Sequence, residues 1–271
     1  MTAGEICGRL LEDVRVSRPL VHHITNWVVT NVSANVTLAA GASPVMAHAI
    51  EEVADMVKCA GALVLNTGTL TPDLVEAMIV AGRQANSLGV PVILDPVGVG
   101  ATPLRTKSVG RILGEVRVGV LRGNAAEIGI VSGAGGDIRG VDSRADANDP
   151  VELARAAARR FRCVAAITGK TDFVSDGETV VMVDNGHEML TRVTGTGCMA
   201  TSVIGAFAAV TKDLLWAAAG ALACYGVAAE IAAAASSGPG TFQAALLDAM
   251  YNLTPSTVKE KARVRAVWPA S

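Results

Sequence analysis

The chain has few aromatic residues, at 3% of its 271 positions, and few charged residues, at 18%. Its charges nearly cancel, because 23 Lys and Arg residues stand against 25 Asp and Glu residues for a formal net charge of −2. A surface that binds nucleic acid needs an excess of basic charge, so nucleic acid is not an expected partner. Apolar residues make up 51% of the chain, which excludes a disordered protein. A membrane, a partner subunit or a large core must cover this apolar excess.

Three stretches with little charge are candidates for membrane spans, and the content of each argues against that reading. The first, 19–50, carries histidines and asparagines that a lipid-facing helix would not tolerate. The second, 193–211, contains a glycine-rich turn, and the third, 214–247, is interrupted by Glu230 and by the Ser/Gly/Pro segment 236–240. No basic region followed by an apolar core, the pattern of a secretory signal, opens the chain. We therefore expect no membrane segment and a cytoplasmic protein.

The five cysteines are scattered, without a C-x-x-C pair or a metal-like spacing to histidine. An odd and dispersed set favours reduced thiols, as in the cytosol. Four of them are interpreted as small buried apolar groups, namely Cys7, Cys59, Cys163 and Cys224. Cys198 is the exception, because it follows a glycine-rich loop.

Short apolar runs alternate with longer helical patterns along most of the chain. The runs predict strands at 62–66, 90–95, 116–121 and 163–168, and a hairpin from 172–175 and 179–184 around Asp176 and Gly177. Continuous apolarity is typical of strands covered on both faces, as in a parallel sheet between helices. The predicted fold class is α/β, a three-layer αβα sandwich with a mostly parallel central sheet. No repeat or linker interrupts the pattern, so residues 1–271 are expected to form a single domain.

Helices are predicted between these strands and after them. Helical periodicity covers 51–60, 71–88 and 148–161. After Cys198 the chain predicts three helices and almost no strand. The alanine-rich part of this region, 217–235, is expected to pack between other elements because small side chains allow close approach of backbones.

Polar and glycine residues gather where four consecutive predicted strands end, at 65–69, 95–102, 122–127 and 168–172. Open α/β sheets bind ligands at the carboxyl ends of their strands, so we expect one shared cleft. The two common nucleotide fingerprints, G-x-x-x-x-G-K-[ST] and G-x-G-x-x-G, are absent. The candidate phosphate loop is 193–198, whose glycines let backbone N–H groups converge ahead of a helix. The alternative is a plain glycine turn before a helix.

Three charged residues lie in these turns. Asp95 and Glu127 end separate strands and are suited to orient Mg²⁺, mostly through water, against a polyphosphate. Taken singly, each is better explained as a helix cap or a solvent-facing turn residue. Arg122 is long enough to pair with phosphate oxygens, and a surface salt bridge is the alternative for it.

The uncharged segment 21–35, together with 41–46, supplies apolar groups and a few hydrogen-bonding side chains. This combination suits a pocket for a small heterocyclic or neutral organic ligand. The alternative is that these polar groups satisfy one another in a buried interface.

The order of motifs along nearly the whole chain closely resembles the hydroxyethylthiazole kinase family, a part of the ribokinase-like superfamily. The motifs that carry the resemblance are 22–31, 41–48, 66–69, 95–101, 122–127, 168–170 and 194–198. The resemblance implies ATP-dependent phosphorylation of the primary alcohol of 4-methyl-5-(2-hydroxyethyl)thiazole, a salvage step in thiamine biosynthesis. It also implies Mg²⁺ as cofactor and a homotrimer with active sites between subunits.

The resemblance further implies roles for individual residues. The thiazole-binding residues are Met46, Gly195 and Asn26; the ATP-binding residues are Arg122, Thr168, Asn124 and Gly197; the Mg²⁺ site holds Asp95 and Glu127. Cys198 is the catalytic residue and stands where many relatives carry an Asp. A helix N-terminus lowers a thiol pKa, yet a low-pKa thiolate is a weak base, so we expect Cys198 to position the alcohol with modest base character. His23 departs from the Asn usual in the family and is expected to tune the pocket.

Two alternatives remain at this point. One is a relative that uses another substrate, such as a hydroxymethylpyrimidine kinase or a nucleotide-hydrate dehydratase. The other is a non-catalytic trimeric protein that senses thiazole or nucleotide, although a sensor has no need of phosphate-transfer groups. The uncharged run 19–50 is predicted to be buried between protomers.

Overall fold

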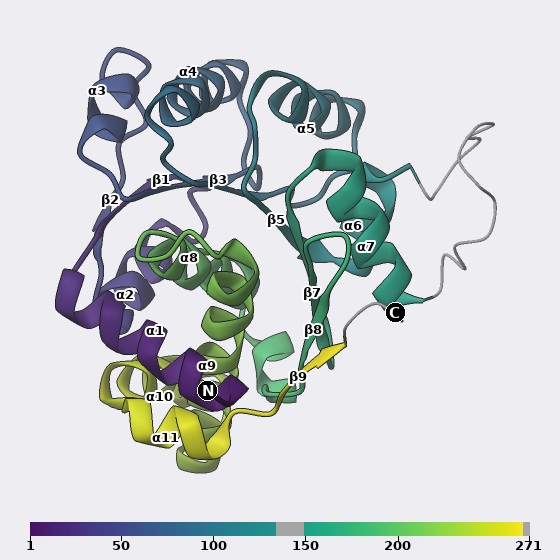
Figure 1. The fold of residues 1–271 in the computed structure, drawn as a ribbon. Helices are drawn as coiled ribbons and strands as arrows, with labels where there is room; N and C mark the ends of the chain where they lie inside the picture. Colours follow the sequence, from purple (N-terminus) through teal and green to yellow (C-terminus); the bar gives the residue numbers. More distant parts are fainter. Residues whose placement is uncertain (134–148, 268–271) are drawn as a thin grey trace.

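The computed structural model describes residues 1–133 and 149–267 and places a nine-stranded sheet through the middle of this part of the chain (Figure 1). The strand order is β2-β1-β3-β4-β5-β6-β7-β8-β9. Strands β1 to β6 are parallel, and β7, β8 and β9 extend the sheet in antiparallel fashion. The strands are β1 Leu20–Ile24, β2 Ser43–Val45, β3 Ala62–Asn66, β4 Val92–Asp95, β5 Val120–Asn124, β6 Val164–Thr168, β7 Asp172–Ser175, β8 Val180–Val183 and β9 Val264–Val267.

Helices cover both faces of the sheet, as Figure 1 shows. One layer consists of α3 Val53–Lys58, α4 Pro72–Leu88, α5 Pro103–Glu115, α6 Ala125–Val131 and α7 Pro150–Phe161. The other consists of α1 Ala3–Ser17, α2 Thr30–Ala40, α8 Thr196–Ala208, α9 Leu214–Ala235, α10 Pro239–Asn252 and α11 Pro255–Lys261. Each layer encloses its own hydrophobic core against the sheet. The predicted three-layer αβα sandwich is confirmed.

Strand β3 illustrates how the sequence produces this arrangement. Successive side chains of a strand point to opposite faces, so Leu63 and Leu65 enter one core while Ala62 and Val64 enter the other. Neither face of β3 reaches solvent, which explains its continuous apolarity. The chain then turns into α4, which begins at Pro72 with the Thr71 hydroxyl accepting from the Leu74 N–H.

The predicted strands 62–66 and 172–175 coincide with β3 and β7, and the predicted hairpin joins β7 to β8. The predicted strand 116–121 was placed too early: β5 begins at Val120, because Val116 and Val118 are buried in the core without joining the sheet. Residue 148, where the third predicted helix opened, lies outside the described residues. The prediction for the last third was incomplete, since α8 to α11 and strand β9 follow Gly195. Strands β1 and β2 were not predicted.

Helix α9 is long and apolar enough to cross a membrane by length and composition, but 78% of its most apolar window is buried inside the fold. It packs between α1, α8 and α10. Glu230 interrupts the uncharged run but lies within this helix, as the predicted alanine-rich helix 217–235 requires. Its carboxylate accepts from the Gly186 N–H (2.9 Å) and pairs with Arg263 (2.6 Å), so the charge is satisfied at the edge of the core.

Helix α1, the first element of the chain, packs against α9 and α11 (Figure 1). The contact is close, since a Cβ at Gly4 would lie 2.7 Å from the Lys259 carbonyl oxygen and a Cβ at Gly8 equally near the Pro255 carbonyl oxygen. The Arg15 guanidinium, from the last turn of α1, donates to the carbonyls of Met250 and Leu253. Helix α1 is therefore tied to the last helices of the chain.

Candidate active site

The candidate site lies at the carboxyl ends of the parallel strands. Asn66, Asp95, Asn124 and Thr168 are the last residues of β3, β4, β5 and β6, and the sheet pairs Asn66 with Asp95 and Asn124 with Thr168. Helix α8 begins over the same edge and packs on β3 and β4. The four strand ends therefore lie along one edge of the sheet, and the shared cleft stays a prediction.

The candidate phosphate loop has the backbone that its glycines allow. Gly195 is the N-cap of α8 with a φ of 84°, and no side chain caps the helix. The first N–H groups of the helix therefore lack a capping acceptor, and they carry its partial positive charge. The Thr196 hydroxyl donates to the Leu190 carbonyl (2.6 Å), and Tyr225 donates to the Thr196 carbonyl (3.0 Å). These bonds hold the loop from its buried side.

Asp95 is fully buried at the centre of the site. Its Oδ2 accepts from the Thr201 hydroxyl (2.8 Å) and from Asn66 Nδ2 (3.0 Å), and it lies 3.6 Å from Arg122 Nη1. Its Oδ1 has no hydrogen-bond partner among the described residues. Burial raises the pKa of Asp95, and the positive charge of Arg122 opposes this rise.

Arg122 joins Asp95 to the predicted ATP-binding residues. Its Nη2 donates to the Thr168 hydroxyl (2.6 Å), and its guanidinium lies against Gly197. Only 9% of Arg122 is exposed, so the alternative of a surface salt bridge is wrong. Three of the four predicted ATP-binding residues thus meet beside the N-terminus of α8.

The fourth, Asn124, forms a reciprocal cap with Glu127. Asn124 Oδ1 accepts from the Glu127 N–H (2.9 Å), while Glu127 Oε2 accepts from the Asn124 N–H (3.0 Å). Glu127 Oε1 accepts from the Gly98 N–H (3.0 Å), which ties the loop after β4 to the loop after β5. The hydrogen bonds of Glu127 therefore match the helix-cap alternative.

The hydrogen bonds of Asp95 and Glu127 show which kind of metal ion the site could hold. The described residues contain no group of three or more His, Cys, Asp or Glu side chains that could hold a metal directly. Glu127 is half-buried with both oxygens on backbone N–H groups, whereas Asp95 keeps one oxygen without a partner. This donor set fits an ion that keeps most of its waters, as Mg²⁺ does beside phosphates, and not an ion caged by protein ligands.

Cys198 lies in the first turn of α8, and its sulfur faces two amides. Asn66 Nδ2 donates to Sγ at 3.2 Å, and Asn26 Nδ2 lies 3.8 Å from the same atom. Burial raises the pKa of the thiol to about 11, and the charge of Asp95 adds to the rise. The expectation of a lowered pKa is therefore wrong, because desolvation and a neighbouring carboxylate outweigh the helix N-terminus. The thiol is protonated at neutral pH.

The predicted thiazole-binding residues come from three different segments of the chain. Gly195 and Asn26 border Cys198, and Asn26 is buried with Nδ2 donating to Asn66 Oδ1 (2.7 Å) and Oδ1 accepting from the Val28 N–H (3.1 Å). Met46 follows β2, the outermost strand of the sheet, where its carbonyl lies 3.2 Å from His48 Nδ1.

His23 is buried on β1 with its Nε2 3.4 Å from the Thr37 hydroxyl. Burial lowers the pKa of His23 to about 3, so the ring is neutral. The contact ties the ring to α2, and its expected effect on the pocket stays a prediction.

Sequence reasoning did not identify Asn66 and Thr201, the two residues that donate to Asp95. Asn66 stood in the quoted motif 66–69 without a role. Thr201 follows Cys198 by three residues, a spacing that puts both side chains on one helix face. Both signals were present, but neither residue type is diagnostic of catalysis.

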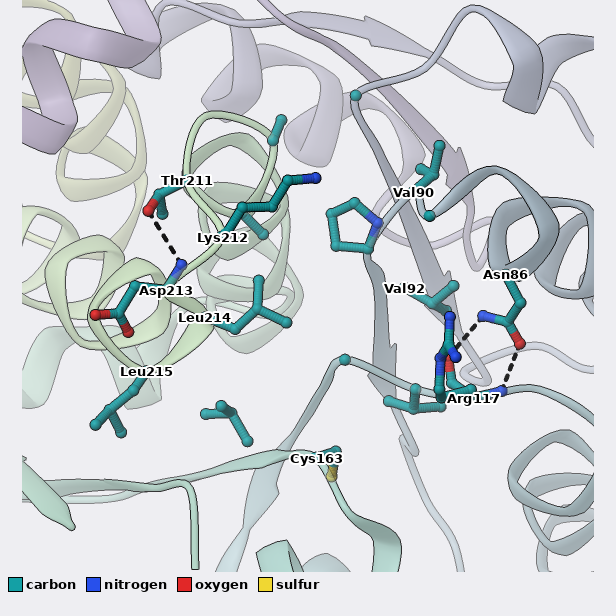
Figure 2. Close-up of a pocket in the computed structure, with 18 of the residues that line it drawn as sticks. Asn86, Val90, Val92, Arg117, Cys163, Thr211, Lys212, Asp213, Leu214 and Leu215 are labelled. Carbon is teal, nitrogen blue, oxygen red and sulfur yellow. Dashed lines mark hydrogen bonds between the residues drawn. The ribbon is translucent and has the colours of Figure 1, made fainter.

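A cavity of about 860 Å³ opens at the opposite end of the sheet, near the first residues of β4 and β6 (Figure 2). Figure 2 shows Lys212 and Arg117 on opposite sides of it, with Val92 and Cys163 between them. None of the predicted site residues lines this cavity. The candidate active site is therefore the residue cluster at the carboxyl ends of the strands, and this cavity lies outside it.

Comparisons with known proteins agree with this geometry. A hydroxyethylthiazole kinase from Desulforudis audaxviator is 58% identical over 254 residues, which are 94% of this chain and 93% of that protein. The solved structure of a hydroxyethylthiazole kinase from Pyrococcus horikoshii is 45% identical, covers 96% of this chain and 98% of its own, and superposes with a TM-score of 0.90. A ribokinase-like superfamily protein from Enterococcus faecalis shares the fold at 14% identity, with a TM-score of 0.62 and 87% of each chain covered. Because residues 11–256 also match the profile of the hydroxyethylthiazole kinase family, the chain belongs to that family.

Proposed function

We propose that the protein transfers the γ-phosphoryl group of ATP to the primary alcohol of 4-methyl-5-(2-hydroxyethyl)thiazole, a salvage step in thiamine biosynthesis. The observation that carries the proposal is one continuous cluster, in which Cys198, Asp95, Arg122 and Thr168 meet beside the uncapped N-terminus of α8. The names of its relatives support the choice of substrate.

Phosphoryl transfer needs alignment of the reactants and neutralisation of the γ-phosphate charge more than it needs a strong base. The N–H groups at 195–198 receive the transferring group, and Arg122 supplies positive charge beside them. Thr168 keeps the Arg122 guanidinium in place through its hydroxyl. Mg²⁺, when bound, neutralises phosphate charge, and Asp95 and Glu127 would hold it through water.

Cys198 then positions the alcohol. A thiol whose pKa is raised to about 11 stays neutral at pH 7, so it does not remove the alcohol proton as a thiolate. Its place in the first turn of α8 puts the sulfur beside the proposed phosphate loop. The modest base character expected from sequence is therefore not part of the proposal.

We further propose a cytoplasmic, single-domain homotrimer with active sites between subunits. Much of 19–50 is buried within its own chain, but four large apolar residues of this segment are exposed, namely Trp27, Val28, Leu38 and Ile50. Trp27 stacks on His48, two residues after the predicted thiazole contact Met46. An apolar surface next to a predicted substrate residue supports a pocket completed by a neighbouring subunit.

The decisive experiment measures thiazole monophosphate by mass spectrometry after incubation with ATP and Mg²⁺. Turnover is expected with the thiazole alcohol and not with hydroxymethylpyrimidine or a nicotinamide-nucleotide hydrate.

Arg122→Lys keeps the charge but loses the planar fork, and its kcat/KM is expected to fall on the order of 10- to 100-fold. If the wild-type protein binds the thiazole but forms no thiazole monophosphate, the result would favour the non-catalytic sensor over the kinase.

A further inference from the structure

Asn66 uses every hydrogen-bonding position of its side-chain amide. Nδ2 donates to Asp95 Oδ2 (3.0 Å) and to Cys198 Sγ (3.2 Å), and Oδ1 accepts from Asn26 Nδ2 (2.7 Å) and from the Gly68 N–H (3.0 Å). An amide has two N–H donors and two acceptor lone pairs, so the group is saturated. Asn66 is only 1% exposed, which leaves it no room to contact a substrate.

The four partners fix the orientation of the amide as well as its position. A flipped amide would set its oxygen against the Asp95 carboxylate and its NH₂ group against the Gly68 N–H, which are two repulsive pairs. The loop cannot relax away easily, because a Cβ at Gly68 would already lie 2.5 Å from Asn26 Nδ2. Asn66 therefore presents its donors to Asp95 and Cys198 and in no other direction.

These partners belong to parts of the site with different tasks. Asn26 lies on the segment predicted to hold the thiazole, Asp95 pairs with the Arg122 that faces the phosphate loop, and Cys198 starts the helix between them. A single saturated amide thus sets the distance between the sulfur and the carboxylate. Thr201 also donates to Asp95 Oδ2 (2.8 Å). The second acceptor near its single hydroxyl hydrogen is the Gly197 carbonyl (3.2 Å) and not the sulfur.

We propose that Asn66 is a positioning residue for phosphoryl transfer, whose amide holds the Cys198 sulfur at a fixed place relative to Asp95. The inference rests on the proposed function. It predicts that Asn66 acts through Cys198, whereas Thr201 acts on Asp95 alone. The two residues therefore form a matched pair, since each donates to the same carboxylate oxygen and only one of them also donates to sulfur.

The test is a double-mutant cycle with Cys198→Ala. Asn66→Ala is expected to lower kcat on the order of 10- to 100-fold, as loss of a supporting residue does, with KM for ATP unchanged within about twofold. On the Cys198→Ala background the same substitution should cost less, namely only what the lost hydrogen bond to Asp95 costs, while Thr201→Val should cost the same on both backgrounds. Full additivity of Asn66→Ala with Cys198→Ala, or an unchanged kcat in Asn66→Ala, would overturn the proposal.

Two further measurements separate a positioning role of Asn66 from a failure to fold and from a wrong choice of substrate. Thermal unfolding checks that Asn66→Ala folds; if it does not, Asn66→Ser enters the same cycle, because its hydroxyl can donate to one partner only. Crystal structures of Asn66→Ala and Thr201→Val give a readout that does not depend on the substrate. In Asn66→Ala the Cys198 side chain should adopt a different rotamer or more than one rotamer. In Thr201→Val it should keep the wild-type rotamer. An unmoved Cys198 contradicts the positioning role, whereas a wild-type protein inactive on the thiazole contradicts the proposed function alone.

Discussion

The Arg122 guanidinium lies directly over Gly197, so that a Cβ at position 197 would stand 2.8 Å from Arg122 Nη1. Real Cβ atoms do not approach other atoms so closely, and something must move. The neighbour that must give way is a side chain that is itself held by Thr168 and Asp95. The absence of a side chain at 197 therefore lets the arginine reach the start of α8.

Gly197→Ala is expected to displace Arg122 without unfolding the protein, since alanine favours a helix. Losing a charge-assisted contact to phosphate should raise KM for ATP about tenfold or more. Steady-state kinetics and a crystal structure check both halves of this prediction. Gly110→Ala in α5 is the control, because a Cβ there meets nothing within 4 Å. It should add roughly 0.5–1 kcal/mol of stability and leave the kinetics unchanged. Equal kinetics for the two variants would show that Arg122 does not need this space.

Cys198→Asp tests whether an acceptor of the alcohol proton helps. The two amides that face the sulfur can donate to a carboxylate, and the nearby Asp95 would raise the pKa of the new group and strengthen it as a base. We expect kcat to be maintained or raised relative to the wild-type enzyme, while Cys198→Ala lowers it. A Cys198→Asp protein that binds the alcohol but no longer phosphorylates it would contradict this view.

Leu38→Asp tests the proposed trimer. Leu38 is 56% exposed in the single chain and lies in the segment 19–50, which carries three other exposed apolar residues, namely Trp27, Val28 and Ile50. Burying a carboxylate in a subunit interface is costly, so light scattering should report the trimer mass for the wild-type protein and a single-chain mass for the variant. Activity should fall at least tenfold if a neighbouring subunit completes the site. Leu104→Asp, at 49% exposure on α5, is the control expected to keep both the trimer and the activity.

The buried carboxyl group of Asp172 is expected to make the free energy of unfolding depend on pH. Burial raises its pKa from 3.8 to about 6, so the folded chain binds more protons than the unfolded chain between these values. The free energy of unfolding therefore falls as pH rises through this window, by about 3 kcal/mol from this group. Asp172→Asn can still accept from the Gly169 N–H and should remove this fall. Urea unfolding of both proteins between pH 4 and pH 8 measures it, and parallel pH profiles would contradict the assignment.

The sequence predicted the layers of the fold well where burial is two-sided. Strands such as β3 are continuous apolar runs, and that pattern admits few other interpretations. Strand β1 was missed because His22 and His23 interrupt its apolar run, although both rings are buried and the Nε2 of each lies within hydrogen-bond distance of one partner. Strand β5 was shifted because apolar residues ahead of it enter the core without joining the sheet.

The sequence predicted which residues form the candidate site, but not the hydrogen bonds and charge effects between them. Residue types and turn positions pointed to Asp95, Arg122 and Cys198, since charge and nucleophilicity are visible in a sequence. The pKa of Cys198 was not predictable, because it depends on burial and on a carboxylate more than 100 residues away in the chain. Asn66 was not identified for the same reason: a saturated amide is recognisable only by its partners, which come from β4, α8 and the loops after β1 and β3.

The packing of α1 against α9 and α11 has a consequence for the order in which the molecule forms. The carbonyl groups bonded by Arg15 lie 235 and 238 residues further along the chain, so these hydrogen bonds cannot form until the last helices have been synthesised. Contacts of such long sequence separation form late and slow the final step of folding. During translation most of the apolar side of α1 therefore stays exposed to solvent until α9 and α11 have been synthesised.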